Sequence, residues 1–317
     1  MVGINLGFAR FLVAARQAGV NFDETLTIGR QNYYVHVEDS MGLLRGVGHE
    51  LGFEECKKLL YCGKGYAEPF FHALGARSCD SIDVSAYEHA TVIHDLNLPV
   101  PEALYERFSA VVDAGSLEHV FNVPTAIRNC MNMVRPGGHL ILNAPGNNLM
   151  GHGFYQFSPE LFYNVLCEGN GFCGTRVMVV ENVIPWRFQE ARNPAAIRSR
   201  VELRNLRETV LFVISKKQKT VDWTNRIPQQ SDYTATWDSE NPVHRNHLAG
   251  FSDALLERRA GYNSLLPRDF KDWLLGAYFS LRDLPLLWSR RRRFRGDWYS
   301  EVSPDAFVET TTPRNQD

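Results

Sequence analysis

The chain has 317 residues, enough for about two domains, or for one α/β domain with a large addition. Apolar residues make up 44 % of it and charged residues 22 %, a composition typical of a folded globular protein. The formal net charge of −2 excludes a global attraction to nucleic acid. The six cysteines form no CxxC pair and no zinc-ligand spacing, so reduced thiols and a cytoplasmic location are expected.

The apolar segment near the start of the chain, residues 8–20, makes a poor signal peptide. Arg10 and Arg16 interrupt it, and no small-residue cleavage site follows. No run of apolar residues approaches the ~18 that a membrane span requires. The sequence therefore predicts a protein without a membrane span.

The first half of the chain alternates between helical and extended patterns. Apolar spacing predicts a leading helix over residues 7–18, and the β-branched run at residues 25–28 predicts the first strand. Residues 32–65 hold two charged helical patterns and are expected to form an insertion. The next predicted elements are a helix at 67–74, strands at 79–83 and 91–94, a helix from Pro101, a strand at 108–113, a helix at 123–134, a turn at 135–138 and a strand at 139–143.

The second half begins with a predicted helix at Ser158 and Pro159, since serine caps helices and proline suits their first turn. Asn193 and Pro194 predict another helix, inside an arginine-rich segment, residues 185–207, that is expected to cover a site. The segments 175–183 and 209–215 are rich in β-formers and are expected to pair as an antiparallel edge.

The alternation of strands and helices predicts an α/β fold with a doubly wound, mostly parallel sheet. Three parts are expected. Residues 1–24 form an N-terminal helix, residues 25–216 form a ligand-binding domain with insertions at 32–65 and 185–207, and residues 217–317 form a polar linker and a C-terminal extension with an apolar helix at 270–288.

Three acids, Asp83, Asp95 and Asp113, each follow a predicted strand. In an open α/β sheet the ligand lies at the carboxyl ends of the strands. Asp83 is placed to accept from ribose hydroxyls and Asp95 from an adenine amino group, although both could simply cap the segments that follow. Acids at successive strand ends favour a nucleoside site. The GxGxxG phosphate fingerprint is absent, which disfavours a dinucleotide and a nicotinamide oxidoreductase.

Several motifs, in this order, resemble the class I S-adenosylmethionine-dependent methyltransferases. They are Asp83-Val84-Ser85, His94-Asp95-Leu96-Asn97, the segment Val112 to Val120, Arg135-Pro136-Gly137-Gly138 and Asn143-Ala144-Pro145. The likeness is strongest to a bacterial branch linked to saccharide or secondary-metabolite modification; it extends through the segment GHGFYQF, residues 151–157, and covers residues 20–215. It implies a Rossmann-like fold, S-adenosylmethionine as cofactor and methylation of a small molecule or glycan, on oxygen before nitrogen.

The resemblance also implies which residues contact the cofactor. They are Gly29, Arg30 and Gln31 in the first loop, Asp83 and Ser85 at the ribose, Asp95 and Leu96 at the adenine, and Asp113, Ala114 and Gly115 at the methionine end. A sulfonium cation is favoured near carboxylates, which suits this set. The first loop departs from the family pattern because Gly29 is its one glycine.

An alcohol acceptor needs a base, and His119 and His152 are the candidates, with Glu118 beside the first. Alternatively, His119 orders its own loop and His152 is a turn residue between two glycines. The three side chains could also hold a divalent metal, but no helical ligand spacing supports one, so no metal is expected.

Tyr155 and Gln156 are expected to contact the acceptor, although aromatic residues such as Tyr155 are more often part of a core. Arg290 to Arg293 and Arg295 could meet an anionic surface, or could be a solvated helix end. The rival function is a methyltransferase-like protein that binds a nucleoside or a partner without turnover.

Overall fold

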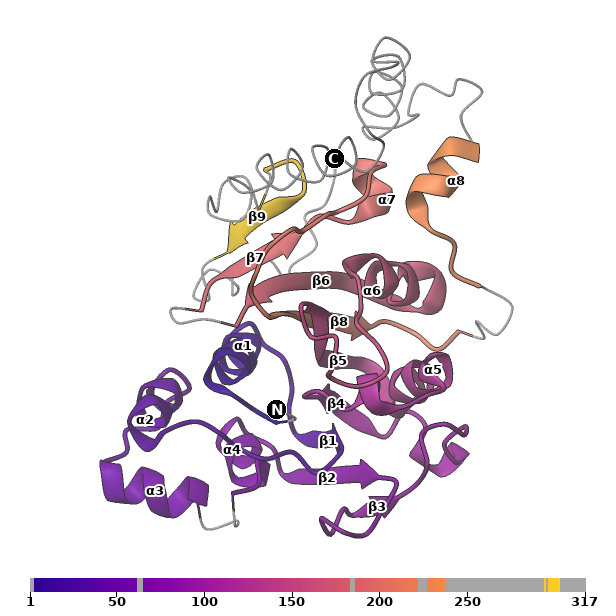
Figure 1. Cartoon of the computed structure of the whole chain (residues 1–317). Coiled ribbons are helices and arrows are strands. Elements are labelled where there is room, and N and C mark those ends of the chain that lie inside the picture. Colours follow the sequence, from indigo (N-terminus) through magenta and orange to yellow (C-terminus); the bar gives the residue numbers. More distant parts are fainter. Residues whose placement is uncertain are drawn as a thin grey trace, which may run out of the picture.

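The computed structural model describes residues 3–61, 65–182, 186–221, 227–237, 294 and 296–302 (Figure 1). The expected apolar helix at 270–288 and the arginines at 290–293 and 295 lie outside the described residues. In the part that the structure describes, no helix has the length and apolar character needed to cross a membrane.

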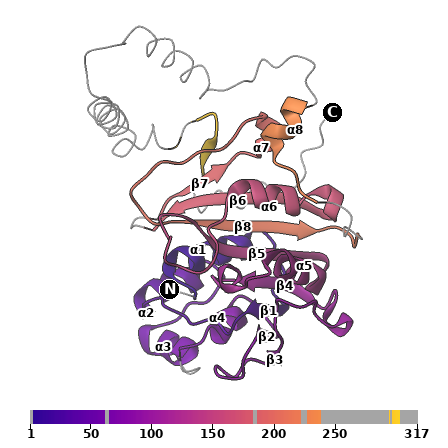
Figure 2. The same ribbon diagram turned by 45° about the vertical axis from the view of Figure 1, so that its right-hand side comes forward.

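A single mixed sheet of nine strands runs through the described residues, and Figures 1 and 2 show its strands stacked from β3 at one end to β7 and β9 at the other. The order is β3-β2-β1-β4-β5-β8-β6-β7-β9. The first five strands of this order are parallel, whereas β8, β7 and β9 pair antiparallel with their neighbours. The strands are β1 (Glu24–Ile28), β2 (Ser78–Asp83), β3 (Val92–Ile93), β4 (Phe108–Asp113), β5 (Val134–Asn147), β6 (Phe172–Glu181), β7 (Phe188–Ala191), β8 (Thr209–Lys217) and β9 (Tyr299–Val302).

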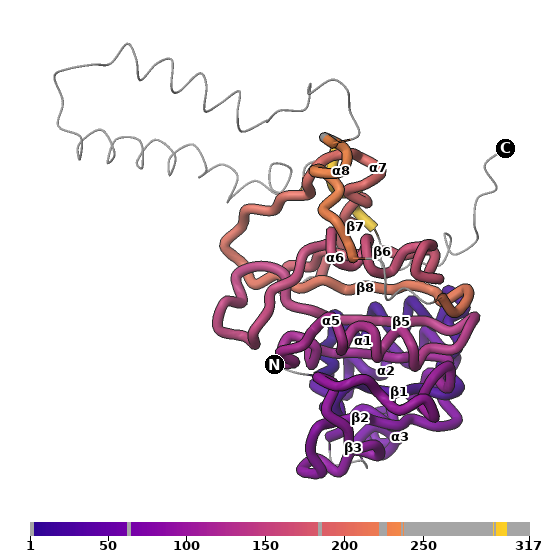
Figure 3. The backbone as a smooth tube through the Cα atoms, turned by 90° about the vertical axis from the view of Figure 1, so that its right-hand side faces the viewer, coloured from indigo at the N-terminus to yellow at the C-terminus, as the bar shows by residue number. Residues whose placement is uncertain are grey.

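Helices cover both faces of the sheet, as Figures 1 and 3 show. One face carries α1 (Leu6–Gln17), α2 (Val37–Arg45), α3 (Phe53–Tyr61) and α4 (Glu68–Ala73), and the other carries α5 (Val123–Met133) and α6 (Pro159–Val165). Two short helices, α7 (Pro194–Ile197) and α8 (Ser231–Trp237), lie near the β7 end (Figure 1). Short 3₁₀ turns are η1 (Glu102–Leu104), η2 (Leu117–His119) and η3 (Glu168–Asn170).

Each face of the sheet has its own hydrophobic core because successive strand residues point to opposite sides. In β4, which is buried along its whole length, Ala110 and Val112 join the core beneath α1, with Phe8 and Phe11. Val111, between them, joins the core beneath α5 and α6. This double burial explains why the strand reads as a continuous apolar run.

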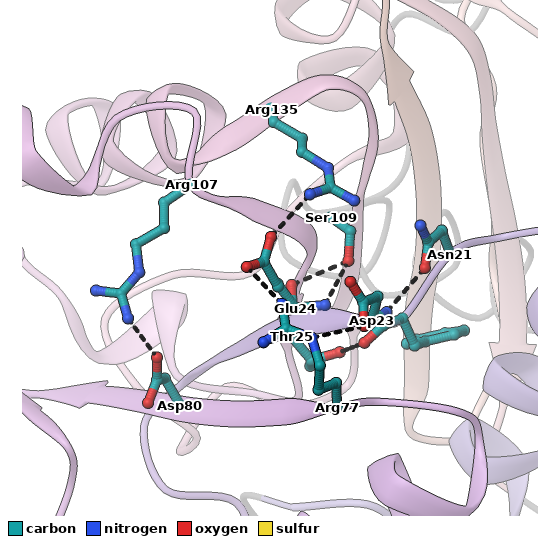
Figure 4. Close-up of polar contacts among 10 residues, drawn as sticks. Asn21, Asp23, Glu24, Thr25, Arg77, Asp80, Arg107, Ser109 and Arg135 are labelled. Carbon is teal, nitrogen blue, oxygen red and sulfur yellow. Dashed lines mark hydrogen bonds and ion pairs between the residues drawn. The ribbon is translucent and has the colours of Figure 1, made fainter.

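The amino ends of the central strands are tied together by polar contacts, drawn in Figure 4. The Glu24 carboxylate accepts from Arg77 at 2.9 Å and from Arg135 at 2.7 Å. The Ser109 hydroxyl donates to the Glu24 carbonyl at 3.1 Å and accepts from its N–H at 2.8 Å. These contacts link β1 to the start of β2, to β4 and to the start of β5.

The predicted elements are largely confirmed, with four differences. The turn expected at residues 135–138 lies inside β5, which already begins at Val134 and includes Gly137 with a φ of +84°. The helix expected from Pro101 is only the single turn η1, because Tyr105 returns to an extended backbone and Glu106 has a φ of +53°. Ser158 begins α6 without a side-chain cap. The expected antiparallel pair, β6 with β8, is present, but β8 lies inside the sheet, and β7 and β9 continue it.

Candidate functional site

The order of the parallel strands reverses between β1 and β4, so the loop after β1 leads to helices on one face of the sheet and the loop after β4 leads to α5 on the other face. This reversal is the place where open α/β sheets bind ligands. The register sets Ile28 opposite both Ile82 and Asp113, which brings the ends of β1, β2 and β4 to one level. The expected site residues at 29–31, 83–85 and 113–119 therefore gather at one edge of the sheet.

Gly29 brings the loop after β1, the first loop, close to the loop after β4. It has a φ of +71°, and a Cβ placed on it would lie 2.8 Å from the Ser116 hydroxyl oxygen. That hydroxyl donates to the Ile28 carbonyl at 2.8 Å and accepts from Gln31 Nε2 at 3.1 Å. Gln31 also donates to Ile28, and its Oε1 is buried without a partner among the described residues. Ser116, which the sequence analysis missed, thus joins the two loops.

Arg30 holds the first loop against the start of α4, where Glu68 lies. Its Nε pairs with Glu68 at 2.6 Å, its Nη1 donates to the Glu88 carbonyl at 2.9 Å, and its guanidinium lies 3.9 Å from the Tyr66 ring centroid. Because these contacts engage the charged group, the side chain holds the loop in place. A direct contact of Arg30 with a cofactor stays a prediction.

Asp83 faces the first loop from the end of β2. Its Oδ1 accepts from the Ser85 N–H at 3.0 Å, and its Oδ2 lies 3.8 Å from the position that a Cβ on Gly29 would take. None of the described residues donates a hydrogen bond to Oδ2, and Asp83 is only half-buried. One carboxylate oxygen is therefore available to a ligand hydroxyl at this edge.

Asp95 forms a local turn at the end of β3. Its Oδ1 accepts from the N–H of Asn97 at 2.9 Å and from the Asn97 side-chain amide at 2.8 Å, and these hydrogen bonds lower the pKa of Asp95. Leu96 is buried in the core beneath α5. Asp95 therefore caps the segment that follows it, one of the two roles expected from the sequence. An adenine contact by Asp95 or Leu96 stays a prediction.

Asp113 is turned inward and is fully buried. Its carboxylate accepts from the Ser116 N–H at 2.8 Å and from the Leu117 N–H at 3.4 Å. Burial raises the pKa of Asp113, although these hydrogen bonds oppose the rise. Gly115, with a φ of +103°, allows the tight turn, and the Ala114 carbonyl accepts from Gly3 at 3.0 Å. Asp113 therefore shapes the loop, and the N-terminal segment crosses it, which the sequence pattern did not predict.

Glu118, His119 and His152 come together although they belong to two separate loops; we call them the Glu118 cluster. One ligand atom from each lies within 4.8 Å of the others. His152 Nε2 is 3.3 Å from Glu118 Oε1, and the two imidazole rings meet edge to face with centroids 5.1 Å apart. All three were candidate site residues from the sequence, and the structure brings their side chains together.

The charge states of the Glu118 cluster follow from its burial. Glu118 is 1 % exposed; burial, and then the charge of Asp113, raise its pKa. Burial lowers the pKa of His119 and of His152, so both imidazoles are neutral near pH 7. A neutral imidazole can accept a proton or bind a metal, and a carboxyl group can serve as a second kind of ligand.

Tyr155 and Gln156 close the loop that carries His152. The Tyr155 hydroxyl donates to the Phe121 carbonyl at 2.6 Å, and Gln156 Oε1 accepts from the Leu149 N–H at 2.9 Å. Phe121 and Phe154 are 71 % and 68 % exposed and pack edge to face, with centroids 5.9 Å apart. This exposed aromatic pair beside the Glu118 cluster includes Phe121, which the sequence analysis did not single out.

A pocket of about 600 Å³ lies at the antiparallel end of the sheet. Residues of α6, β6, β7 and α7 line it, including Cys167, Cys173 and Arg192. None of the expected site residues lines this pocket. This pocket is therefore separate from the candidate site, which lies at the carboxyl ends of β1, β2 and β4.

No protein-family model and no curated protein matches the chain. Solved structures with a related fold include a Thermotoga maritima protein described as an S-adenosylmethionine-dependent methyltransferase and possible histamine N-methyltransferase (14 % identity, 68 % of this chain, 91 % of that chain, TM-score 0.37). Another is the Burkholderia thailandensis 1,6-didemethyltoxoflavin N1-methyltransferase, solved with 1,6-didemethyltoxoflavin and S-adenosylhomocysteine (13 % identity, 67 % of this chain, 78 % of that chain, TM-score 0.35). A third is the Thermus thermophilus branched-chain polyamine synthase (11 % identity, 70 % of this chain, 59 % of that chain, TM-score 0.35). At these identities and TM-scores, the likeness assigns no activity to this chain.

Proposed function

We propose that the protein binds S-adenosylmethionine at the carboxyl edge of its sheet and transfers the methyl group to a small-molecule or saccharide acceptor, on oxygen. The observation that carries the proposal is the meeting of Gly29 and Asp83 at the strand reversal. Gly29 lets the first loop pass close to Ser116 and Asp83, and Asp83 presents an oxygen that no described residue occupies. A ligand with ribose hydroxyls and no phosphate suits a loop that lacks the phosphate fingerprint.

The cofactor contacts follow the strand ends. The first loop, residues 29–31, meets the amino-acid part, Asp83 and Ser85 hold the ribose, and Asp95 with Leu96 frames the adenine. The segment 113–115 lines the methionine end through its backbone, because the Asp113 side chain is fully buried. A ligand in this place lies close to the Glu118 cluster, since Glu118 follows Asp113 in the same short loop.

The chemistry is an in-line displacement. The bond between the methyl carbon and the sulfonium sulfur breaks as a bond to the acceptor oxygen forms, and the sulfonium becomes a neutral thioether. Holding the acceptor at attack distance supplies much of the rate acceleration. The hydroxyl proton of the acceptor must also leave, and the Glu118 cluster, with two neutral imidazoles, is the group that promotes this step.

The acceptor would sit against the aromatic rim. Phe121 and Phe154 are exposed and adjacent, and their ring faces can cover the apolar face of a sugar or an aromatic ring. Tyr155 is half-buried and completes this surface through its contact with the Phe121 carbonyl. The rim therefore supports a small acceptor with a flat or ring-shaped apolar face.

The test is calorimetric titration of the full-length protein with S-adenosylmethionine, S-adenosylhomocysteine and NAD. We expect micromolar binding of the first two and none of the third. Asp83→Ala should weaken binding by about 1–3 kcal/mol, or roughly 5- to 150-fold, because a charged hydrogen bond is lost.

Asp80→Ala is the matched control, since Asp80 lies on the same strand but pairs with Arg107 at 2.9 Å, away from the carboxyl edge (Figure 4). Equal affinity of the folded Asp83→Ala variant and the unchanged protein would reject the ribose assignment. No binding of either sulfur ligand would reject the proposed function. Binding without turnover on any acceptor would favour the rival function, a methyltransferase-like protein that binds a nucleoside or a partner without catalysis.

A further inference from the structure

We infer that Glu118, His119 and His152 form a binding site for one divalent transition-metal ion, with zinc as the best match. The three ligand atoms come from the loop after β4 and from the segment before α6, and they lie within 4.8 Å of one another. His152 Nε2 and Glu118 Oε1 are 3.3 Å apart. Two ligands of a tetrahedral zinc ion are separated by about 3.3 Å when each bond is ~2.05 Å, so this pair already has the required spacing.

The Glu118 carboxyl group lacks a full set of partners. Its side chain is 1 % exposed, and its Oε2 makes no hydrogen bond to any described residue. A buried carboxyl oxygen without a partner is costly, so such groups generally pair with a cation or coordinate a metal. A metal ion in contact with His119 and His152 would compensate for this cost.

The backbone holds His152 over Glu118. The Phe154 N–H donates to the Glu118 carbonyl at 2.7 Å, and the His152 N–H donates to the Leu149 carbonyl at 2.9 Å. Gly153 has a φ of +79°, and a Cβ on it would lie 2.8 Å from the Glu118 carbonyl oxygen, so the two loops touch without space for a larger residue. The arrangement of the ligands is therefore built into the loops, with His119 held by its N–H bond to the Ser116 carbonyl at 3.0 Å.

The kinds of ligand indicate the class of metal. Imidazole nitrogen suits zinc, iron, nickel and cobalt, whereas magnesium and calcium prefer sets made of oxygen atoms alone. Two imidazoles and one carboxylate are three protein ligands, the number that a zinc ion uses when its fourth position stays open to a substrate. The 28 % exposure of the His152 side chain indicates that a small molecule can reach the site from solvent.

If the protein is a methyltransferase as proposed, the metal also has a role in the reaction, and this role rests on that proposed function. An ion at this position would bind the acceptor hydroxyl and lower its pKa, as metal ions do for bound water. The hydroxyl proton would then leave to solvent, and the resulting oxygen anion would attack the methyl carbon as the bond to sulfur breaks. The two histidines would act as ligands in this case and would not need to accept the proton.

Metal binding itself is tested on chelator-treated, full-length protein titrated with Zn²⁺ in a calorimeter. We expect one site whose affinity falls by at least about 100-fold in His119→Ala and in His152→Ala, because each variant removes a direct ligand. Glu118→Gln keeps the size of the buried side chain and should weaken binding in the same direction. His244→Ala and His247→Ala change another closely spaced histidine pair of the sequence and should leave the affinity unchanged.

Substitution with Co²⁺ identifies the ligands. We expect visible absorption bands without the near-ultraviolet thiolate band that cysteine ligation would produce. Azide, as a probe for an open coordination position, should shift these bands. Circular dichroism of each variant separates the loss of a ligand from the loss of the fold.

Two results would overturn the inference: no Zn²⁺ binding by the unchanged protein, or binding of equal strength in folded His119→Ala and His152→Ala. Titration of the same samples with S-adenosylmethionine separates this failure from that of the proposed function. Cofactor binding without a zinc site would remove only the metal. A zinc site without cofactor binding would retain the metal and reject the methyltransferase assignment.

Discussion

Replacing Gly29 with alanine should destabilise the protein and also weaken cofactor binding, because two separate costs meet at this position. A residue with a Cβ costs about 1–2 kcal/mol in the left-handed region that the φ of +71° requires. The new Cβ would also lie 2.8 Å from the Ser116 hydroxyl oxygen and 3.3 Å from Gln31 Nε2. Ser116 would have to rotate and lose its hydrogen bond to Ile28, which is worth about 1 kcal/mol. The expected total loss in the free energy of unfolding is about 2–3 kcal/mol.

Gly137→Ala is the matched control. Gly137 has a φ of +84°, and nothing lies within 4 Å of a Cβ placed there, so the change should cost only the conformational part, about 1–2 kcal/mol. Urea unfolding followed by circular dichroism measures both losses. The difference between them, about 1 kcal/mol, isolates the crowding against Ser116.

A double substitution tests the cause directly. Ser116→Ala removes the hydroxyl that the new methyl group would meet, so Gly29→Ala in that background should cost no more than Gly137→Ala. Calorimetry with S-adenosylmethionine should show weaker binding for Gly29→Ala and unchanged binding for Gly137→Ala. The reasoning is refuted if the two glycine variants lose equal stability, or if the loss at Gly29 is the same with and without Ser116.

Two further predictions concern buried titratable groups away from the site. Burial, and then Lys216, lower the pKa of His139 to about 4, below its ordinary value of 6.5. Because the folded protein keeps this imidazole neutral, its contribution is fully present above pH 6.5 and is lost as the pH falls toward 4. We expect the free energy of unfolding to fall by about 2 kcal/mol between pH 8 and pH 5 from this group. Urea unfolding of His139→Gln should show that much less pH dependence, and an identical profile would contradict the assignment. Lys217 is 3 % exposed and donates to the carbonyls of Met131 at 3.0 Å and Val134 at 2.8 Å at the end of α5. Lys217→Met should therefore lower the free energy of unfolding in urea by about 1–3 kcal/mol, whereas Lys216→Met, at an exposed position, should lower it by less than about 0.5 kcal/mol. Equal losses would argue against the role of Lys217 in binding the carbonyls at the end of α5.

Short-range patterns predicted much of the fold. The apolar run before Asp113 predicted the central strand, because a strand buried on both faces must be apolar at every position. The spacing of apolar residues predicted α1, and Asn193 predicted α7, whose Ala195 N–H bonds the Asn193 side chain at 3.0 Å. The same local logic failed at Pro101, since an extended Tyr105 and the positive φ of Glu106 end the helix after one turn.

The candidate site was only partly predictable. Asp83 and the Glu118 cluster were selected from their places after strands and beside glycines, and Gly29 from the family resemblance. The sequence did not show that the Asp113 side chain turns inward, because the direction of a carboxylate depends on which backbone N–H groups the loop presents to it. It also gave no reason to choose Ser116, whose hydroxyl bonds a carbonyl 88 residues earlier in the chain.

The sequence by itself therefore determined most of the helices and strands and which acids and histidines follow the strands, because side-chain periodicity, capping and glycine conformation act over a few residues. It did not predict β7, β9 or α8. Only the tertiary structure decided which loops touch. The contact of Gly29 with Ser116, the closure of His152 over Glu118 and the pairing of β9 with β7 join residues far apart in the chain. Such contacts arise from strand order and from the packing of helices on both faces of the sheet, which no local pattern encodes.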